Sequence, residues 1–514
     1  MAKNRLKRGV VYLVGAGPGD PGLFTVRGVK LLQRADAIVF DRLVNPSLLD
    51  YAPLHAEKIY AGKLPDRHTL TQDEINSLLV KLAVKGKTVV RLKGGDPLLF
   101  GRGAEEALFM AKHGIRFEIV PGVTSALAVP AYAGIPPTFR NYTSSLGIFT
   151  GHEDPGKESS AIAWDKIATG LGTLIFLMGV ENLNSIVNKL ISHGRHKSTP
   201  CCVIRWGTTF HQQTVSATLQ TIADKSARAG ITSPAVLIVG EVVKLREQIK
   251  WFETRPLFGK KFLITSPVED ARRLTGPLTE AGAECIEMPM IKISGLQNKS
   301  TLISSLESLD RFAWVIFTSQ NGVRFFQQAL VGIKKDIRIL AGIKIAAIGP
   351  KTAEALEALG VKVDVRPRKF CQEGLIEEFK KYAVRGKSIL MIRAAEARDV
   401  LPEGLKKMGA FVSVVPAYKT VPVDYGKKEK SLIEDCDMVT FTSSSCVESF
   451  QNNFPSHAEV CAASLGPVTS ATAKKYGLRV AVEAREYVLE SLIEGITKYY
   501  TNKAGCKPER RTPA

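Results

Sequence analysis

The stretch TVVRLKGGDPLLFGRGAEEALFMAK, residues 88–112, contains a β-rich run, a glycine loop and a helical segment in that order. The apolar and β-branched residues of 88–92 predict a buried strand, and residues 104–112 predict a helix. Between them, the glycines and the proline of 93–97 mark a loop. A strand that leads through a glycine loop into a helix is typical of α/β proteins.

The same alternation of β-rich and helical segments extends through the first half of the chain and predicts α/β layers. Three prolines between residues 130 and 137 interrupt it and predict two lobes, at about 10–138 and 139–250. Residues 251–258 show no periodicity, so we expect a linker there, followed by a second α/β domain over 259–502.

The second domain contains an internal duplication. Three blocks recur in the same order, and each consists of a β-rich run, a loop and a helical segment. This repetition predicts two similar, doubly wound, flavodoxin-like α/β lobes. The matching blocks are GKKFLITS (259–266) with GKSILMIR (386–393), VIFTSQNGV (315–323) with VTFTSSSCV (439–447), and AAIGPKTAEAL (346–356) with AASLGPVTSATA (462–473).

The net charge favours an anionic partner. Lysine and arginine number 70 and aspartate and glutamate 50, a balance of +20. Nucleic acid, a membrane surface or a small molecule with many carboxylates or phosphates fits such a charge. The basic residues are spread, without the basic runs of typical nucleic-acid binders, so we expect a small-molecule polycarboxylate and no nucleic acid. The basic ends, 1–9 and 503–514, are expected to be disordered arms.

Cysteine spacing and hydropathy indicate in which cellular compartment the protein is expected. None of the eight cysteines forms a CxxC pair or lies at zinc-finger spacing from histidine, which predicts reduced thiols, no metal and a cytoplasmic protein. No apolar run approaches the ~18 residues of a membrane span, and no export signal is visible. We therefore expect no membrane partner.

Three glycine loops follow successive predicted strands, at 15–22, 93–97 and 121–125. Carboxyl ends of strands in α/β sheets bind ligands, so these loops are expected to converge on a cleft. The first loop satisfies GxGxxG, but its two prolines lack N–H donors and its aspartate would repel a pyrophosphate. A tight turn is therefore a better interpretation of that loop than NAD binding.

From about Val10 to Trp251 the chain resembles uroporphyrinogen-III C-methyltransferase, a tetrapyrrole methylase. The motifs that carry the resemblance are GAGPGDPGL, DRLV, VRLKGGDPLLFGRGAEE, VPGVTSA and SPAVLIVGEVV. Ala104 departs from the glycine that is commoner in the family. The resemblance implies a two-lobed methylase that transfers methyl groups from S-adenosylmethionine to two pyrrole carbons of uroporphyrinogen III, giving precorrin-2. We also expect a homodimer formed through this half.

The resemblance also implies the site residues. Asp41 and Lys63 match the catalytic pair: Asp41 would remove a proton after methylation, and Lys63 would orient a substrate carboxylate or stabilise charge. From the residues alone, a helix cap at Asp41 and a solvated charge at Lys63 remain alternatives. The donor-binding positions correspond to Pro18, Gly94, Gly95, Asp96, Leu99, Thr124, Ser125, Met178 and Gly207.

Two hydroxyl pairs, Thr318 with Ser319 and Thr442 with Ser443, each lie between a predicted strand and a predicted helix. Such residues cap helices, and helix N-termini also bind carboxylates. The pairs would form an anion site if they faced one cleft between the lobes. No conventional nucleophile motif is present in this half.

Residues from about Gly259 to Lys498 resemble uroporphyrinogen-III synthase, through FTSQNGV, IGPKTAEAL, PAYKT, FTSSS and LGPVTSATA. The resemblance implies cyclisation of hydroxymethylbilane with inversion of the last ring. Tyr418 matches the family's functional tyrosine and is the candidate proton donor, although a packed tyrosine at a strand end is an alternative. The two hydroxyl pairs would hold substrate carboxylates. The implied lobes are 259–293 plus 421–502, and 294–420.

Together these features predict a bifunctional cytoplasmic enzyme that makes uroporphyrinogen III and methylates it, for sirohaem or cobalamin synthesis. One alternative is a methylase of a later corrin intermediate with an inactive or regulatory second half. A basic RNA-binding protein and an NAD-dependent dehydrogenase are further alternatives.

Overall fold

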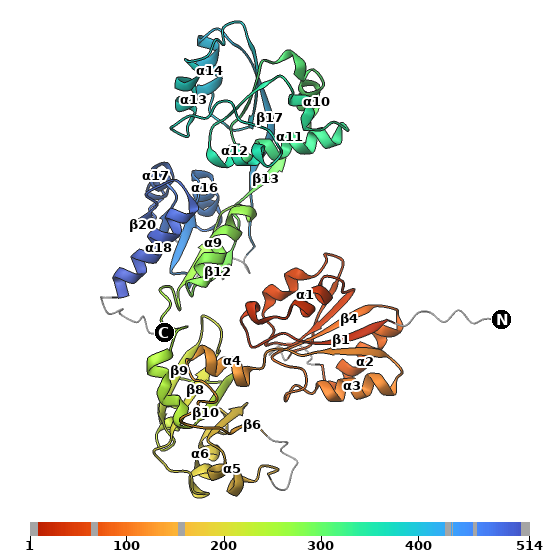
Figure 1. Ribbon diagram of the computed structural model, residues 1–514, viewed down its shortest axis with the longest axis vertical. Coiled ribbons are helices and arrows are strands. Elements are labelled where there is room, and N and C mark those ends of the chain that lie inside the picture. Colours follow the sequence, from red (N-terminus) through yellow and green to blue (C-terminus); the bar gives the residue numbers. More distant parts are fainter. Residues whose placement is uncertain are drawn as a thin grey trace, which may run out of the picture. The chain divides into compact units, whose positions relative to one another are not determined.

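The computed structural model describes residues 9–62, 70–152, 160–426, 433, 435–455 and 460–504. The chain divides into two compact units, Met1–Lys260 with Ala281–Glu284, and Lys261–Glu280 with Cys285–Ala514 (Figure 1). Of the expected disordered arms, residues 1–8 and 505–514 lie outside the described residues. Gly9 is described, and its N–H donates to the Ala83 carbonyl. The expectation is wrong for residues 503 and 504, because a C-terminal helix continues to Ala504.

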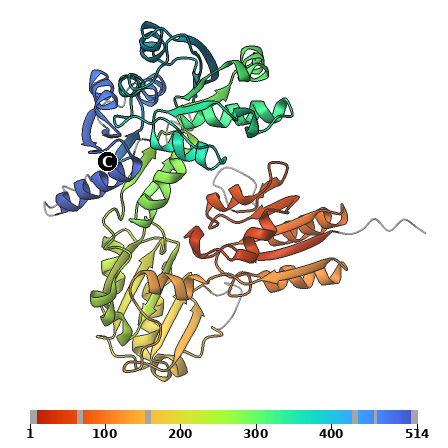
Figure 2. The same cartoon turned by 45° about the horizontal axis from the view of Figure 1, so that its top comes forward.

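The first sheet of the first unit is parallel and is covered by helices on both faces (Figures 1 and 2). Its strands, in the order β3-β2-β4-β1-β5, and its helices are β1 (Val10–Gly15), β2 (Ala37–Phe40), β3 (Glu57–Tyr60), β4 (Thr88–Lys93), β5 (Arg116–Val120), η1 (Pro21–Leu23), α1 (Val26–Leu32), η2 (Pro46–Tyr51), α2 (Gln72–Val84) and α3 (Gly103–Lys112). Alternate strand residues pack on opposite faces: Leu13 lies under α2 and α3, and Val14 lies under α1. The predicted strand at 88–92 and helix at 104–112 are confirmed.

The second sheet of this unit has the order β6-β7-β10-β8-β9, and only its β6–β7 pair is parallel. One face packs against α5, α6 and α7, and the other against α4 and η3. The elements are α4 (Ser125–Tyr132), β6 (Leu146–Thr150), α5 (Trp164–Gly170), β7 (Thr173–Leu177), α6 (Leu183–Ser192), β8 (Pro200–Arg205), β9 (Gln213–Thr218), α7 (Ile222–Arg228), β10 (Ala235–Val239), η3 (Glu241–Leu245) and α8 (Arg246–Ile249).

Two expected boundaries in this unit differ from the structure. The division between the lobes lies before α4 and not near residue 138, because Ala126 and Val129 of α4 are buried against the second sheet. Pro130 lies inside α4 and does not end the lobe. Residues 251–258, the expected linker, belong to the first compact unit, in which Phe252 and Leu257 are buried.

The second unit contains two five-stranded sheets. The first has the order β12-β11-β18-β19-β20, with α16 and α17 on one face and α9 and α18 on the other. The neighbouring strands β11, β18, β19 and β20 of this sheet are parallel. The elements are β11 (Lys261–Ile264), α9 (Val268–Glu280), β12 (Glu284–Glu287), β18 (Met438–Phe441), α16 (Ser444–Asn453), β19 (Cys461–Ser464), α17 (Pro467–Lys475), β20 (Arg479–Glu483) and α18 (Leu489–Ala504).

The other sheet has the order β13-β17-β16-β14-β15, in which only the edge strand β13 is antiparallel to its neighbour. Helices α10, α11 and α12 cover one face, and α13 and α14 cover the other. The elements are β13 (Ile291–Gly295), α10 (Ser300–Glu307), η4 (Leu309–Arg311), β14 (Trp314–Phe317), α11 (Gln320–Gly332), η5 (Ile337–Leu340), β15 (Lys344–Ala347), α12 (Pro350–Glu357), α13 (Gln372–Phe379), β16 (Ser388–Ala394), α14 (Val400–Lys407) and β17 (Phe411–Pro422).

Strands β13 and β17 carry the chain between the two sheets of the second unit. Ile291 pairs with Pro422, so both strands belong entirely to the sheet that contains β14. Met290 and Ile291 both pack in the core beside β11, so β13 begins where that core ends. The chain therefore crosses just before Ile291 and just after Pro422, close to the expected limits at 293 and 421.

Candidate active sites

The first unit contains a cavity of about 580 Å³ between its two sheets. Loops after β1, β2, β4 and β5 form one wall, because the carboxyl ends of parallel strands meet at one edge of a sheet. Loops after β7 and β8 form the other wall, together with the start of β10. Since β10 is antiparallel to β7 and β8, its first residues lie at the same edge as their last residues.

All nine residues expected to bind the methyl donor line this cavity. Three loops of the first sheet, after β1, β4 and β5, contribute seven of them, the last of these loops continuing into α4, and the second sheet contributes two. The residues are Pro18, Gly94, Gly95, Asp96, Leu99, Thr124, Ser125, Met178 and Gly207.

Glycine allows the loops of the first sheet to approach closely. An added Cβ at Gly15 would lie 2.5 Å from Gly122 Cα and 2.6 Å from the Gly95 carbonyl oxygen. The Gly95 N–H donates to the Gly17 carbonyl at 2.7 Å, which joins the loops after β4 and β1. Gly95 has φ +67°, and an added Cβ there would have no atom closer than 3.9 Å. This part of the cavity wall therefore consists of backbone atoms, and the space beside Gly95 is open.

Two aspartates of the glycine loops stabilise the loops through hydrogen bonds that their carboxylates accept. Asp96 accepts hydrogen bonds from the N–H groups of Leu98, Leu99 and Gly122 at 2.8, 3.2 and 3.0 Å. Asp20 accepts a hydrogen bond from the Tyr132 hydroxyl at 2.6 Å. Burial, with the hydrogen bond to Asp20, raises the pKa of Tyr132.

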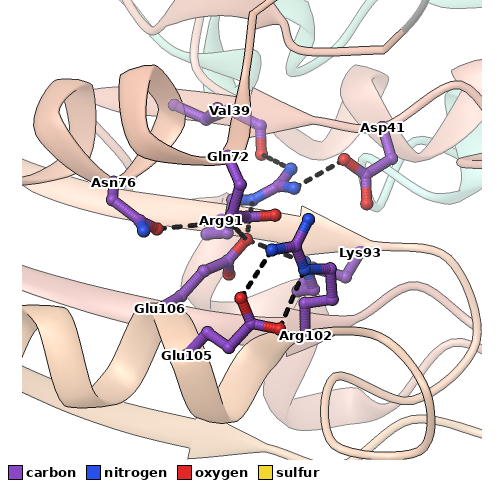
Figure 3. A network of polar contacts seen from close by, with 9 residues as sticks. All are labelled: Val39, Asp41, Gln72, Asn76, Arg91, Lys93, Arg102, Glu105 and Glu106. Carbon is purple, nitrogen blue, oxygen red and sulfur yellow. Dashed lines mark hydrogen bonds and ion pairs between the residues drawn. The ribbon is translucent and has the colours of Figure 1, made fainter. Parts of the chain in front are cut away.

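Asp41 follows β2 and lies beside the cavity, while the next two residues, Arg42 and Leu43, line it. Arg91 Nη2 contacts Asp41 Oδ1 at 2.6 Å, as Figure 3 shows. Asp41 caps no helix in the described ranges, since Asn45 is the N-cap of η2, so the helix-cap alternative is wrong. Lys63 lies outside the described residues.

Tyr418 is the central residue of the candidate site in the second unit. Its hydroxyl lies 2.7 Å from Ser319 Oγ, and its ring stacks on Phe325 with centroids 5.7 Å apart. Burial raises the pKa of Tyr418, so the phenol stays protonated at neutral pH. Ser319 caps α11 by accepting from the Gly322 N–H at 3.1 Å, as its position between strand and helix predicts.

The two predicted hydroxyl pairs lie on different sheets of this unit. Thr318 follows β14, and its N–H and hydroxyl both donate to the Ile392 carbonyl. Thr442 follows β18, and Ser443 caps α16 by accepting from the Cys446 N–H at 3.3 Å. Within the described part of the chain no hydrogen bond joins the two pairs, so each forms its own helix start.

Comparisons with known proteins match the two units separately. Residues 10–223 match the tetrapyrrole (corrin/porphyrin) methylases, and residues 272–494 match uroporphyrinogen-III synthase HemD. A porphyrin biosynthesis protein HemD of Ruminiclostridium josui is 38% identical over 95% of this chain and 98% of that protein. The chain belongs to the tetrapyrrole methylase and uroporphyrinogen-III synthase families.

Two further proteins that are similar to this chain carry the name of a C-methyltransferase. A uroporphyrinogen-III C-methyltransferase of Bacillus subtilis (strain 168) is 43% identical over 70% of this chain and 73% of that protein. A solved uroporphyrin-III C-methyltransferase from Thermus thermophilus, complexed with S-adenyl homocysteine, is 39% identical over 46% of this chain and all of that one, with a TM-score of 0.41. The chain is a fusion of two enzymes, a tetrapyrrole methylase and a uroporphyrinogen-III synthase.

The methylase cavity also contains residues that the motifs did not predict. Phe100, Met178 and Trp206 line it with φ of 53°, 55° and 48°, and Met178 alone was expected there. Such backbone angles cost energy in non-glycine residues and occur often at functional sites. Trp206 directly follows β8, as the other cavity loops follow their strands, and this position was the signal that could have identified it. Ser233 and Pro234 begin the SPAVLIVGEVV motif, although no site role was predicted for them.

Two further observations concern metals and membranes. Among the residues that the structure describes, no group of three or more histidine, cysteine, aspartate or glutamate side chains has a metal-binding arrangement. None of the helices in the same ranges combines the length and apolarity needed to cross a bilayer.

Proposed function

We propose that the methylase unit transfers two methyl groups from S-adenosylmethionine to uroporphyrinogen III, giving precorrin-2. We also propose that the synthase unit supplies that substrate by cyclising hydroxymethylbilane. The observation that carries the first proposal is the cavity of about 580 Å³ whose wall contains all nine expected donor-binding residues. Its volume lies within the ~300–1,000 Å³ of small-molecule sites.

The cavity wall fits a donor with an adenosine and an amino-acid part. Gly94 and Gly95 offer backbone groups without side chains, and Thr124 and Ser125 add hydroxyls at the start of α4. The apolar side chains of Leu99 and other wall residues exclude water. When bound there, S-adenosylmethionine supplies an electrophilic methyl group on a sulfonium. The loops would contribute to rate mainly by holding donor and acceptor in line.

Asp41 is the group that we propose to take the proton released after methylation. Its side chain is 30% exposed and its loop leads directly into the cavity wall, which supports access to a bound tetrapyrrole. Arg91 holds the carboxylate at 2.6 Å. For Lys63 we retain the proposed role of orienting a substrate carboxylate or stabilising charge.

In the synthase unit we propose that Tyr418 donates the proton with which the hydroxyl of hydroxymethylbilane leaves as water. The raised pKa of Tyr418 keeps its proton available, and Ser319 orients the phenol at 2.7 Å. We propose that Thr318 and Ser319 at α11, and Thr442 and Ser443 at α16, hold substrate carboxylates near helix N-termini.

The cellular setting follows from the same chemistry. The excess of 20 positive charges suits substrates that carry many carboxylates. The described cysteines are free thiols, in keeping with a reducing compartment, and we infer a cytoplasmic enzyme for sirohaem or cobalamin synthesis. We further infer a homodimer through the methylase unit, which light scattering of the purified chain tests.

Supplied uroporphyrinogen III tests the methylase directly. Under anaerobic conditions with S-adenosylmethionine, the wild-type chain should give a product two methyl groups heavier by mass spectrometry. Asp41→Asn should lose this activity and still cyclise hydroxymethylbilane, because the synthase residues lie in the other unit. Methylation of a later corrin but not of uroporphyrinogen III would refute the proposed substrate.

A further inference from the structure

Three charged side chains are buried next to Asp41, as Figure 3 shows. Arg91 and Lys93 belong to β4 and Glu106 to α3, and they are 2%, 3% and 0% exposed. Charged side chains are rarely buried without partners. With Asp41 ionised, the four groups form two positive and two negative charges, so the network is neutral.

Glu106 anchors both cations of this network. Its Oε1 accepts from Arg91 Nε at 3.1 Å, from Lys93 Nζ at 2.8 Å and from Gln72 Nε2 at 3.1 Å. Its Oε2 is buried and has no hydrogen-bond partner among the described residues. Glu106 therefore sets the position of the guanidinium from the side opposite to Asp41.

Arg91 connects this anchor to the proposed base. Its Nη2 contacts Asp41 Oδ1 at 2.6 Å, and its Nη1 donates to the Val39 carbonyl at 3.4 Å. Asp41 Oδ2 makes no hydrogen bond within the ranges that the structure describes. The guanidinium thus fixes one carboxylate oxygen and leaves the other to accept a proton.

We propose that Arg91 is a positioning residue for methylation, held in place by Glu106, an inference that rests on the proposed role of Asp41. Arg91 keeps the carboxylate oriented before the reaction. Methylation leaves the pyrrole ring cationic, because the substituted carbon that receives the methyl group carries no hydrogen. A proton on a ring nitrogen or on the adjacent bridge carbon then moves to Asp41 Oδ2, and the electron pair of the broken bond stays in the tetrapyrrole and neutralises the ring. The network is then left with one excess positive charge, which favours release of the proton to solvent.

Among the charged groups near Asp41, Arg91 is the cation that contacts its carboxylate directly. Burial, with the charge of Arg91, lowers the pKa of Lys93, whereas a guanidinium keeps its charge at any physiological pH. Arg102 and Glu105 pair with each other at 2.6 Å on the surface. The adjacent elements also carry titratable groups: Arg42 after β2, Glu57, Lys58 and Tyr60 in β3, and Asp73, Glu74 and Lys81 in α2.

A split between kcat and KM tests this inference in the full-length chain. We would measure kcat and KM for uroporphyrinogen III at saturating donor for wild type, Arg91→Gln and Arg91→Lys, with Arg102→Gln as the matched surface control. A carboxylate that is no longer held in place accepts the proton less efficiently, but the substrate and the donor still bind. Arg91→Gln should therefore lower kcat by about tenfold and leave KM for uroporphyrinogen III unchanged.

The control variants separate charge from structure. Arg102→Gln should keep the wild-type kcat, and Arg91→Lys should recover only part of it, because an ammonium lacks the second arm of the guanidinium. S-adenosylhomocysteine should bind all variants with unchanged affinity in calorimetry. A wild-type kcat in Arg91→Gln overturns the inference and leaves the proposed function intact.

Other outcomes also overturn the inference. Loss of donor affinity in both Arg91 variants would mean that Arg91 only supports the fold. A wild-type kcat in Asp41→Asn would mean that another group is the base. No methylated product from the wild-type chain at any pH would instead refute the proposed function, and the inference with it.

Discussion

Gly15→Ala is the substitution that most directly tests the packing of the donor-binding loops. Gly15 ends β1 and does not line the cavity, so a methyl group there touches no ligand. Its Cβ would meet three backbone atoms, Gly122 Cα at 2.5 Å and both Gly122 N and the Gly95 carbonyl oxygen at 2.6 Å. Backbone cannot rotate away as a side chain does, so the loops themselves must move.

The size of the movement follows from these distances. Ordinary van der Waals contact begins at 3.4 Å, so each contact is short by about 0.8 Å. A displacement of about 1 Å in a positioned site costs on the order of 100-fold in rate. We expect a loss of about that size in kcat/KM for methylation, with weaker binding of S-adenosylhomocysteine. Overpacking should also cost about 1–3 kcal/mol of stability.

The assay combines calorimetry of S-adenosylhomocysteine binding with initial rates of methylation under anaerobic conditions. Gly170→Ala is the matched control, because an added Cβ there has no atom within 4 Å and the residue lies in α5 of the same unit. The synthase activity of the same chain should stay unchanged in both variants. Wild-type donor affinity and rate in Gly15→Ala would refute the claim that these loop contacts form the site.

Three further predictions concern single side chains. Tyr418→Phe should lower the rate of cyclisation by about 10²-fold or more, as for loss of a general acid, and leave methylation of supplied uroporphyrinogen III unchanged in separate product assays. The pKa of Tyr132 is raised in the folded chain, so the unfolded chain loses the phenol proton at a lower pH, about 10, than the folded chain does. The free energy of unfolding should therefore fall as the pH rises above that value. Tyr132→Phe should show less of this alkaline loss in denaturant titrations of the first unit, and should lose about 1 kcal/mol at neutral pH with the bond to Asp20. Burial raises the pKa of Cys202 to about 12, so alkylation at neutral pH should label it only after unfolding, which mass spectrometry of peptides detects. Rapid labelling in the native chain would contradict that burial.

The glycine loops of the first unit were predictable because a parallel sheet brings the ends of its strands to one edge. Gly94 and Thr124 belong to different loops, and both line the cavity. The motifs that resemble the methylase family carried this prediction to Met178 and Gly207 in the second sheet. Ser233 opens the SPAVLIVGEVV motif, but its place in the cavity wall was not predictable, because it depends on the antiparallel placement of β10 between β7 and β8.

The buried charges could not be predicted from local sequence. Arg91 and Glu106 lie in a strand and a helix where charged side chains ordinarily face solvent, and only the packing of α3 on β4 brings them together. Helix caps were easier to predict, because Ser319 and Ser443 follow strand-like runs directly. The sequence could not show that these two caps belong to different sheets without a hydrogen bond between them.

The central claim, that one chain carries both activities, is tested most directly by supplying hydroxymethylbilane alone or with S-adenosylmethionine under anaerobic conditions. Products would be followed by absorbance and mass. We predict uroporphyrinogen III without the donor and a product two methyl groups heavier with it. Formation of no uroporphyrinogen III, while supplied uroporphyrinogen III is still methylated, would contradict the assignment of the second unit.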